Sequence, residues 1–428
     1  MMNVNRKIQP KYELINTINI PPVEAIKLDN NISVASINAG MQDIIKLDLL
    51  FYAGDWMQKK TLVAGFTNEM LKEGTTKYPS SQISEKLDFY GAFLHQTISK
   101  DFAQLTLFTL KKFFQETIII FEDIIKNPSF SIDEFVKFVN KEKQYFQIEQ
   151  SKVSNLSREK FFEQIFGQQN PYGKIEKLSD FDNVTVDDLK KFHAKYYNAN
   201  NCKIIISGKV ELNDIAILNN AFGGKDWITK EKIELPDYEL SQASSDITIV
   251  NKKDAVQSAI YIGKKIINKR NDDYIKLQVT NTVLGGYFGS RLMKVLRENK
   301  GYTYGISSIL MSYQNAGVFF IVTEVGADNT KNAVDNILTE ISKLRNELVP
   351  VDELNLVKNY LLGSVLRMFD GPFAISTAYK SLIEFNMDIE YYKKTIKIIK
   401  NISSEEIKYI ANKYLNEQTM VKVVAGKY

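Results

Sequence analysis

The sequence predicts an α+β protein of two homologous lobes, each a mostly antiparallel sheet packed against helices. Three observations predict this. The chain has 428 residues, which is too long for one ordinary hydrophobic core. Segments of its two halves match at a nearly constant offset. Each half also runs through strands, then helices, then a closing strand, an order typical of an α+β sandwich.

The internal repeat is clearest where each half closes. KYYNANNCKIIISGKV at 195–210 matches KYLNEQTMVKVVAGKY at 413–428, with Lys, Tyr, Asn, Gly and Lys at a constant offset of 218. Upstream, TVDDL at 185–189 matches SSEEI at 403–407 at the same offset. Both upstream segments predict a helix start, because a Ser or Thr N-cap is followed three residues later by an acidic residue.

A third pair of segments extends the repeat. SIDEFVKFVNKEK at 131–143 parallels PVDELNLVKNYLL at 350–362 at an offset of 219, so the drift is one residue. Three matches in the same order indicate a duplicated unit of roughly 220 residues. We therefore expect an N-terminal lobe at 1–226, a polar linker at 227–243 and a C-terminal lobe at 244–428.

The elements of the first half follow from local periodicity. SVASINAG at 33–40 and DIIKLDLLFYAG at 43–54 are predicted to be paired strands. FAQLTLFTL at 102–110 alternates and predicts another strand, and helices are predicted near 112–126 and 132–150.

The second half repeats this order. Its predicted strands are 247–250, 258–263 and 316–325, and its predicted helices lie near 271–285, 290–300, 329–346 and 352–368.

Composition excludes several functional classes. The net charge is +4 without a basic block, which argues against nucleic-acid binding. Cys202 is the single cysteine, so no internal disulfide framework is possible. The N-terminus lacks a secretory h-region, and no apolar run reaches about 18 residues, so we expect a cytoplasmic protein without a membrane span.

The segment GFTNEMLKEGT at 65–75 resembles a metal-binding helix without its ligands. Positions 65 and 69 are four apart and share one helix face. In H-x-x-E-H, two His at that spacing bind Zn²⁺, and the Glu between them polarises the attacking water. Here those positions hold Gly65, Asn68 and Glu69.

The chain resembles the pitrilysin and mitochondrial processing peptidase family, whose motif runs roughly H-x-x-E-H-M-L-F-K-G-T. The resemblance extends over nearly the whole chain. It includes GAFLHQTISKD at 91–101, KEKQYFQIEQ at 141–150, NPYGK at 170–174 and the long match GGYFGSRLMKVLRENKGYTYGISS at 285–308. It implies the duplicated fold of these inverzincin metallopeptidases and places the third zinc ligand at Glu149.

The departures from that motif bear on function. Both His ligands and the Glu base are missing, so the resemblance implies no intact catalytic residue among Gly65, Asn68, Glu69 and Glu149, and we expect no metal in this chain. One alternative is a substitute site built from Glu69, Glu149 and His95, because one His and two carboxylates are a legitimate zinc set. Asn68, however, cannot act as a general base.

The second half retains two residues that the resemblance assigns to substrate binding, Arg297 and Tyr304. SRLMKVLRENKG predicts a helix, and YTYGISS predicts a strand with Tyr302 and Tyr304 on one face. The resemblance implies that Arg297 and Tyr304 reach across a chamber to a zinc lobe, where they would donate to a peptide carbonyl. The alternative is a surface Arg that pairs with a carboxylate and a Tyr that fills a core edge.

Two further residues are expected to be structural. His193 lies in a predicted helix without a second ligand at metal-binding spacing, so we expect a packed or surface side chain. Cys202 begins an apolar strand and is expected to be buried.

These observations favour a non-catalytic, peptidase-like subunit that binds extended peptide and supplies Arg297 and Tyr304 to the zinc site of a partner. The partner would be a zinc-bearing sister chain or a second copy of this chain. One alternative is a peptide-binding or structural chamber protein without a role in proteolysis. A second is an active peptidase with an atypical metal site.

Overall fold

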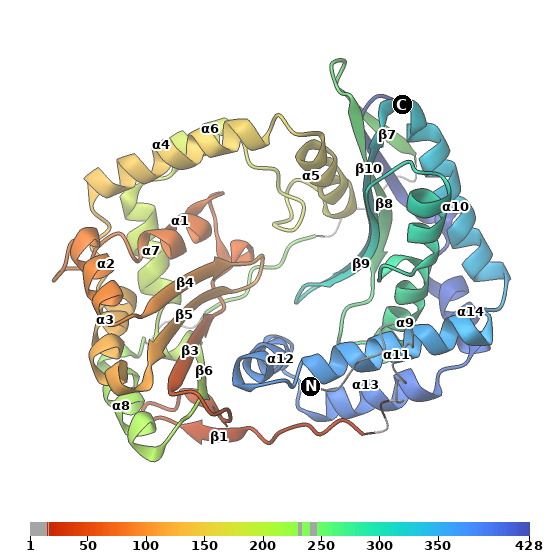
Figure 1. Cartoon of the computed structure of the whole chain (residues 1–428). Coiled ribbons are helices and arrows are strands. Elements are labelled where there is room, and N and C mark those ends of the chain that lie inside the picture. Colours follow the sequence, from red (N-terminus) through yellow and green to blue (C-terminus); the bar gives the residue numbers. More distant parts are fainter. Residues whose placement is uncertain (1–14, 16, 230–232, 240–245) are drawn as a thin grey trace, which may run out of the picture.

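The computed structural model describes residues 15, 17–229, 233–239 and 246–428. The chain forms two lobes that face each other, each built on one sheet with helices around it (Figure 1). The first sheet has the order β1-β2-β6-β3-β5-β4. Its strands are β1 (Glu24–Lys27), β2 (Ser33–Asn38), β6 (Cys202–Gly208), β3 (Ile44–Phe51), β5 (Ala103–Leu110) and β4 (Phe93–Ile98).

The predicted pairing of 33–40 with 43–54 is wrong. Both segments are strands, β2 and β3, but β6 lies between them, parallel to β2 and antiparallel to β3. β6 is buried along almost its whole length, as expected for a central strand covered on both faces. A pairing inferred from neighbouring segments could not foresee a strand that returns about 150 residues later.

The second sheet repeats the first without an equivalent of β1. Its order is β7-β11-β8-β10-β9, with β11 parallel to β7 and antiparallel to β8, as β6 is to β2 and β3. This correspondence confirms the predicted fold of two homologous lobes. The strands are β7 (Ile247–Asn251), β11 (Val421–Gly426), β8 (Gln257–Ile266), β10 (Gly317–Gly326) and β9 (Ile306–Ser312).

Each half also carries a series of helices around its sheet. The first half has α1 (Val63–Met70), α2 (Ser80–Phe89), α3 (Phe114–Lys126), α4 (Ile132–Glu149), α5 (Val153–Phe166), α6 (Leu178–Asn183), α7 (Val186–Tyr196) and α8 (Leu212–Phe222). The second has α9 (Tyr274–Gly285), the π-helix η5 (Met293–Asn299), α10 (Thr330–Asn346), α11 (Val351–Arg367), α12 (Pro372–Glu384), α13 (Glu390–Asn401) and α14 (Ser404–Tyr414). Short 3₁₀ turns lie at η1 (Asp55–Met57), η2 (Lys111–Phe113), η3 (Ala199–Asn201), η4 (Lys225–Trp227), η6 (Ala327–Asn329) and η7 (Glu417–Thr419).

The predicted helix starts are present in both halves. Thr185 caps α7 in a capping box with Asp188, and Ser403 caps α14 in the same way with Glu406. Each cap satisfies backbone N–H groups that the first helical turn leaves free. The two equivalent helices therefore begin through the same local chemistry.

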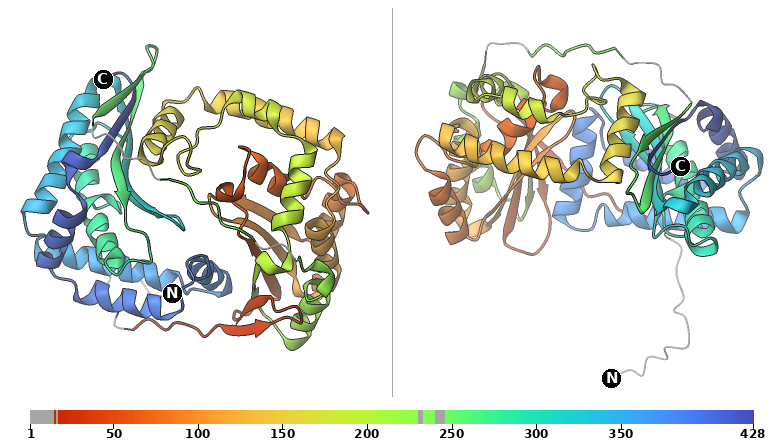
Figure 2. Two further views of the ribbon diagram at one scale, coloured as in Figure 1. Left: turned by 180° about the vertical axis from the view of Figure 1, so that it is seen from behind. Right: turned by 90° about the horizontal axis from the view of Figure 1, so that it is seen from above.

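Each lobe gives one helix to the other lobe. α5 of the first half packs on β8 and β11, and α12 of the second half packs on β6 and β2. The exchange joins the cores, because Phe161 of α5 belongs to the same buried cluster as Phe320 of β10. Figures 1 and 2 show both helices between the lobes, where they close the chain into a ring.

The start of the described chain also crosses to the second lobe. Ile15, Ile18, Ile20 and Val23 pack against the hydrophobic cluster of that lobe before β1 joins the first sheet. The domain boundaries 1–226, 227–243 and 244–428 stay predictions, since residues 230–232 and 240–243 of the linker lie outside the described part.

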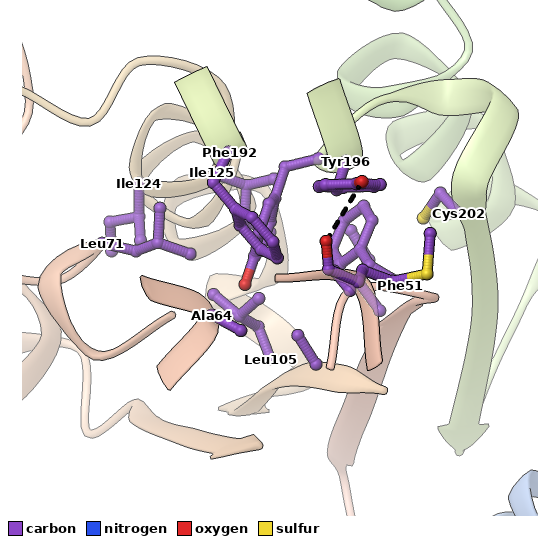
Figure 3. Packing of buried hydrophobic residues seen from close by; sticks show 14 of the residues in the cluster. Phe51, Ala64, Leu71, Leu105, Ile124, Ile125, Phe192, Tyr196 and Cys202 are labelled. Carbon is purple, nitrogen blue, oxygen red and sulfur yellow. Dashed lines mark hydrogen bonds between the residues drawn. The ribbon is translucent and has the colours of Figure 1, made fainter. Parts of the chain in front are cut away.

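The core of the first lobe is packed behind α1. Figure 3 shows Ala64 and Leu71 beside Ile124 and Phe192, and all four side chains are buried. Cys202 lies in the same cluster, and burial raises the pKa of its thiol, so the prediction of a buried cysteine is confirmed. No helix in the described ranges is both long and apolar enough to cross a bilayer.

Candidate functional site

The predicted metal-binding segment forms helix α1 and the turn after it. The helix starts after Leu62, at φ +73°, and buries Phe66 and Met70 in the core. Gly74 follows at φ +129°, a backbone conformation that L side chains rarely adopt. The frame of the motif is therefore kept because the core and the turn need it.

A cavity of about 390 Å³ lies along the inner face of α1. Its wall comes from η1, α1, β4, α4, α5, α6 and neighbouring loops, all in the first half of the chain. The lining residues are Asp55, Leu62, Gly65, Phe66, Glu69, Ile98, Phe138, Glu142, Tyr145, Phe146, Glu149, Gln150, Asn155, Arg158, Glu159, Glu176 and Phe181. Three of the four degenerate positions, Gly65, Glu69 and Glu149, are thus brought together.

Gly65 faces open space. A Cβ built at this position would meet no atom within 4 Å. The backbone therefore leaves room for a side chain at the first ligand position, although glycine supplies no donor atom there.

Asn68 is turned into the fold and away from the cavity. Its side chain is fully buried, its Nδ2 donates to the carbonyl oxygen of Thr97 at 3.0 Å, and its Oδ1 accepts from the Tyr197 hydroxyl at 3.3 Å. Its own carbonyl accepts a hydrogen bond from Gln96 Nε2. These bonds connect α1 to β4 and to the end of α7, so the former base position now has a structural role.

The two carboxylates at ligand positions are engaged with lysines. Glu69 forms an ion pair with Lys72 at 3.4 Å. Glu149 accepts from Lys152 at 2.5 Å and from Asn155 Nδ2 at 2.7 Å, and these bonds lower the pKa of its carboxyl. Both side chains therefore have local partners of their own.

The cavity is strongly acidic. Six carboxylic side chains line it, against one arginine, Arg158. Burial, reinforced by the nearby Asp55, raises the pKa of Glu176 to about 7. Such a surface attracts cationic groups rather than anions.

The residues present do not fit the zinc ion that this motif would carry. Position 65 has no donor and position 68 faces the core. In the described part of the chain, no group of three or more His, Cys, Asp or Glu side chains is arranged to hold a metal. His95 does not line the cavity: it neighbours Gln96 on β4, and because adjacent strand residues face opposite sides, it points away from α1.

Arg297 lies in the second lobe, on the π-helix η5. The wide turn is closed by a hydrogen bond from Lys300 N to Val295 O at 3.1 Å, five residues back. The Arg297 guanidinium lies over the Phe288 ring, 4.5 Å from its centroid, and Phe288 is 64% exposed. No carboxylate of a described residue forms an ion pair with Arg297, so the predicted alternative of surface pairing is not what the structure shows.

Tyr304 is not on a strand as predicted. β9 begins only at Ile306, and Tyr304 lies in the preceding loop with 94% of its surface exposed. Tyr302 instead packs partly against the core of the lobe, so the two side chains do not share a strand face. The segment bends at Tyr304, where Thr303 Oγ1 donates to Gly305 O at 2.8 Å and accepts from Gly305 N at 3.0 Å before the strand starts.

Two family models match the chain. Residues 33–174 match the model described as "Insulinase (Peptidase family M16)", and residues 183–361 match the one described as "Peptidase M16 inactive domain". Together they span both halves and include every predicted site residue. The chain belongs to peptidase family M16. This is the pitrilysin family predicted from the motifs, and the chain is a member that lacks the zinc motif.

Curated relatives cover most of this M16 chain. An "Uncharacterized zinc protease" of Rickettsia felis is 24% identical over 93% of this chain and 96% of its own length. In Helicobacter pylori, a "Non-peptidase homolog YmxG" is 24% identical over 79% of this chain and 78% of its own length. The same organism has a "Zinc protease PqqE" that is 21% identical over 79% of this chain and 78% of its own length.

Solved structures share the fold. The "peptidase M16 inactive domain from Pseudomonas fluorescens" superposes with a TM-score of 0.87 at 23% identity, over 95% of this chain and 98% of that chain. The structure of "a protease from Helicobacter pylori" has a TM-score of 0.88 at 17% identity, over 95% of this chain and 100% of that chain. At these identities the likeness concerns the fold.

Sequence reasoning missed several residues of the M16 chain's cavity. Glu142, Glu159 and Glu176 line it together with Glu69. Outside the cavity, in the second lobe, sequence reasoning also missed Phe288, whose ring lies under the Arg297 guanidinium. Glu142 and Glu149 on α4 and Glu159 on α5 are acidic residues of two consecutive helices. This pattern could have predicted an acidic surface beside the motif helix. His193, by contrast, is a packed residue as predicted: its Nε2 lies 2.7 Å from the Ile125 carbonyl oxygen, and burial lowers its pKa.

Proposed function

We propose that the chain is a non-catalytic peptidase subunit that binds an extended peptide and supplies Arg297 and Tyr304 to the zinc site of a partner subunit. One observation carries the proposal. In the described part of the first lobe no group of side chains is arranged to hold a metal, and an inward-facing Asn68 stands at the base position. The second lobe presents an exposed tyrosine, Tyr304, and an arginine, Arg297, that has no carboxylate partner among the described residues.

The first part of that observation concerns catalysis. Hydrolysis by this fold needs a metal-bound water and a general base. Gly65 offers neither, Asn68 is hydrogen-bonded inside the core, and Glu69 and Glu149 are held by lysines. The chain alone is therefore expected not to cleave peptides.

The second part concerns Arg297 and Tyr304. Tyr304 is almost fully exposed, and Arg297 has no ion pair with a described carboxylate. An exposed aromatic ring that supports a guanidinium keeps the donors of that group available. Such donors suit a peptide carbonyl and the oxyanion that forms when water attacks it.

Peptide binding is supported by the two sheets. β4 and β9 end their sheets, so each has one edge without a strand partner in the described structure. A strand edge with free backbone groups can accept an extended peptide. On β4, Phe93 is 62% exposed and presents an apolar contact beside that edge.

The pairing with a zinc-bearing sister is supported by the relatives. Helicobacter pylori has both a relative named a non-peptidase homolog and one named a zinc protease. A division of labour between two such chains would explain why this chain keeps the fold without the metal site.

Mixing tests the proposal. We expect no cleavage of a peptide library by the pure chain, and cleavage when the zinc-bearing M16 chain of the same organism is added, faster than by that chain alone. Arg297→Ala should lower the kcat of the mixture by roughly 100-fold, as removal of an oxyanion donor does. Lys294→Ala, an exposed cation on the same helical segment, is the matched control and should leave the rate unchanged.

Each alternative predicts a different result. A mixture that is no faster than the sister chain alone would favour a binding or structural protein. Full activity with Arg297→Ala would mean that this residue is not used. Cleavage by the pure chain that chelators abolish would favour an atypical metal site.

A further inference from the structure

Two adjoining cavities lie in the second lobe, away from the motif helix. The first, about 120 Å³, is enclosed by α9, α11, α12 and α13, and its wall includes the buried apolar side chains of Val279, Leu361 and Val365. The second, about 230 Å³, is lined mainly by polar residues of the loops before α9 and before α13. Lys269 and Tyr391 line both cavities, so the two spaces meet at these residues.

Lys269 is a cation without a matching anion. Its Nζ donates to the Ser381 hydroxyl at 2.6 Å and lies 5.3 Å from the centroid of the Phe385 ring. No carboxylate of a described residue lies within 4.0 Å of this ammonium. Burial lowers the pKa of Lys269, and the more distant Glu384 opposes that effect only in part. A partly buried ammonium without a carboxylate partner is stabilised by an anion that reaches it.

The other cations at the polar cavity are already engaged. Arg270 donates to the backbone carbonyl of Gln314 at 2.8 Å and to its side chain at 2.5 Å. Lys394 forms an ion pair with Asp272 at 2.5 Å. Arg270 likewise has no carboxylate partner among the described residues, but its guanidinium is already bonded to the neutral oxygens of Gln314. Lys269 donates only to the Ser381 hydroxyl, so its ammonium has donors left for an anion that enters from the polar cavity.

From this juxtaposition we propose that the second lobe binds a small monocarboxylic acid with an apolar tail, whose carboxylate pairs with Lys269 while the tail fills the apolar cavity. Tyr391 lines both cavities, and its hydroxyl, whose pKa burial raises further, is a second possible donor for the carboxylate. The inference is independent of the peptide-binding function, since its residues lie on other elements.

The size of the apolar cavity limits the tail. An apolar cavity of about 150 Å³ accommodates benzene, so the space here fits a chain of about four to six carbons. Hexanoate is a suitable probe. Hexanol tests the need for the negative charge, because it has the same tail with a neutral head.

Calorimetric titration of the full chain tests the proposal. We expect hexanoate to bind with a Kd of about 1 mM or tighter, and hexanol to bind at least about tenfold more weakly. Lys269→Met keeps the length of the side chain but removes the charge, and it should weaken hexanoate binding at least about tenfold while leaving hexanol unchanged. Lys393→Met removes an exposed cation of α13 that pairs with Glu390 at 2.6 Å and lines neither cavity. It is the matched control and should bind hexanoate like the wild type.

A second variant keeps the proposal falsifiable if Lys269→Met is unstable. Val365→Phe fills the apolar cavity and should abolish binding of both probes, with folding checked by thermal denaturation. The proposal is overturned if hexanoate does not bind, if hexanol binds equally well, or if the two lysine variants lose affinity to the same extent.

Discussion

Replacement of Asp48 by alanine is expected to lower the free energy of unfolding by about 3–5 kcal/mol. Asp48 lies on β3 with 1% of its surface exposed, and its carboxylate forms an ion pair with the buried Lys46 at 2.9 Å. It also accepts from Gln104, from Thr106, and from Ser376 of α12 at 2.7 Å. Its removal would leave the Lys46 ammonium buried without a carboxylate.

Because Ser376 belongs to the second half, this buried network also joins the two lobes. Denaturant unfolding followed by circular dichroism measures the effect. Asp43→Ala is the matched control, since Asp43 pairs with Lys209 at 2.7 Å on the surface, and it should cost less than about 1 kcal/mol. Lys46→Met combined with Asp48→Asn should recover part of the loss, because no unpaired charge is left and the amide oxygen still accepts hydrogen bonds. A loss with Asp48→Ala as small as with Asp43→Ala would contradict the role of the network.

The double variant Gly65→His, Glu69→His is expected to bind Zn²⁺ with a Kd of about 1 μM or tighter. The two new imidazoles would stand four residues apart on α1, and position 65 has open space for a side chain. Glu149 lines the same cavity and would supply the third ligand. Competition with a chromophoric chelator measures the affinity.

The control for this variant is a further change of Glu149→Gln, which should weaken zinc binding at least about tenfold. The double variant should still fail to cleave peptides, because Asn68 cannot serve as a base and faces the core. Absence of zinc binding by the double variant would mean that the frame of the former site has changed shape as well as chemistry.

Much of the fold could be predicted because its signals are local or repeated. The capping boxes at Thr185 and Ser403 could be predicted from the sequence, since each cap and its acidic partner lie three residues apart. The position of β6 between β2 and β3 could not be predicted from the sequence, because it depends on a strand that returns from far along the chain. The exchange of α5 and α12 between the lobes also depends on tertiary packing.

The sequence predicted which residues stand at the candidate site, but it did not predict which way their side chains point. The motif placed Gly65, Glu69 and Glu149 together correctly, but periodicity could not show that Asn68 turns inward to Thr97 and Tyr197. A strand pattern could not show that Tyr304 precedes the strand, because the bend there is accompanied by hydrogen bonds that join Thr303 and Gly305 to each other and to Thr323 of β10. The Lys269 cavities escaped prediction since their walls come from four separate helices and the loops beside them.

The most direct test of the central claim is the zinc content of the wild-type chain after equilibrium dialysis against zinc, measured together with peptide cleavage. We expect no retained zinc and no cleavage, because the former ligand positions offer a glycine and two carboxylates without a histidine, and the former base position holds an inward-facing amide. Stoichiometric zinc that is lost on Glu149→Gln, accompanied by chelator-sensitive cleavage, would contradict it.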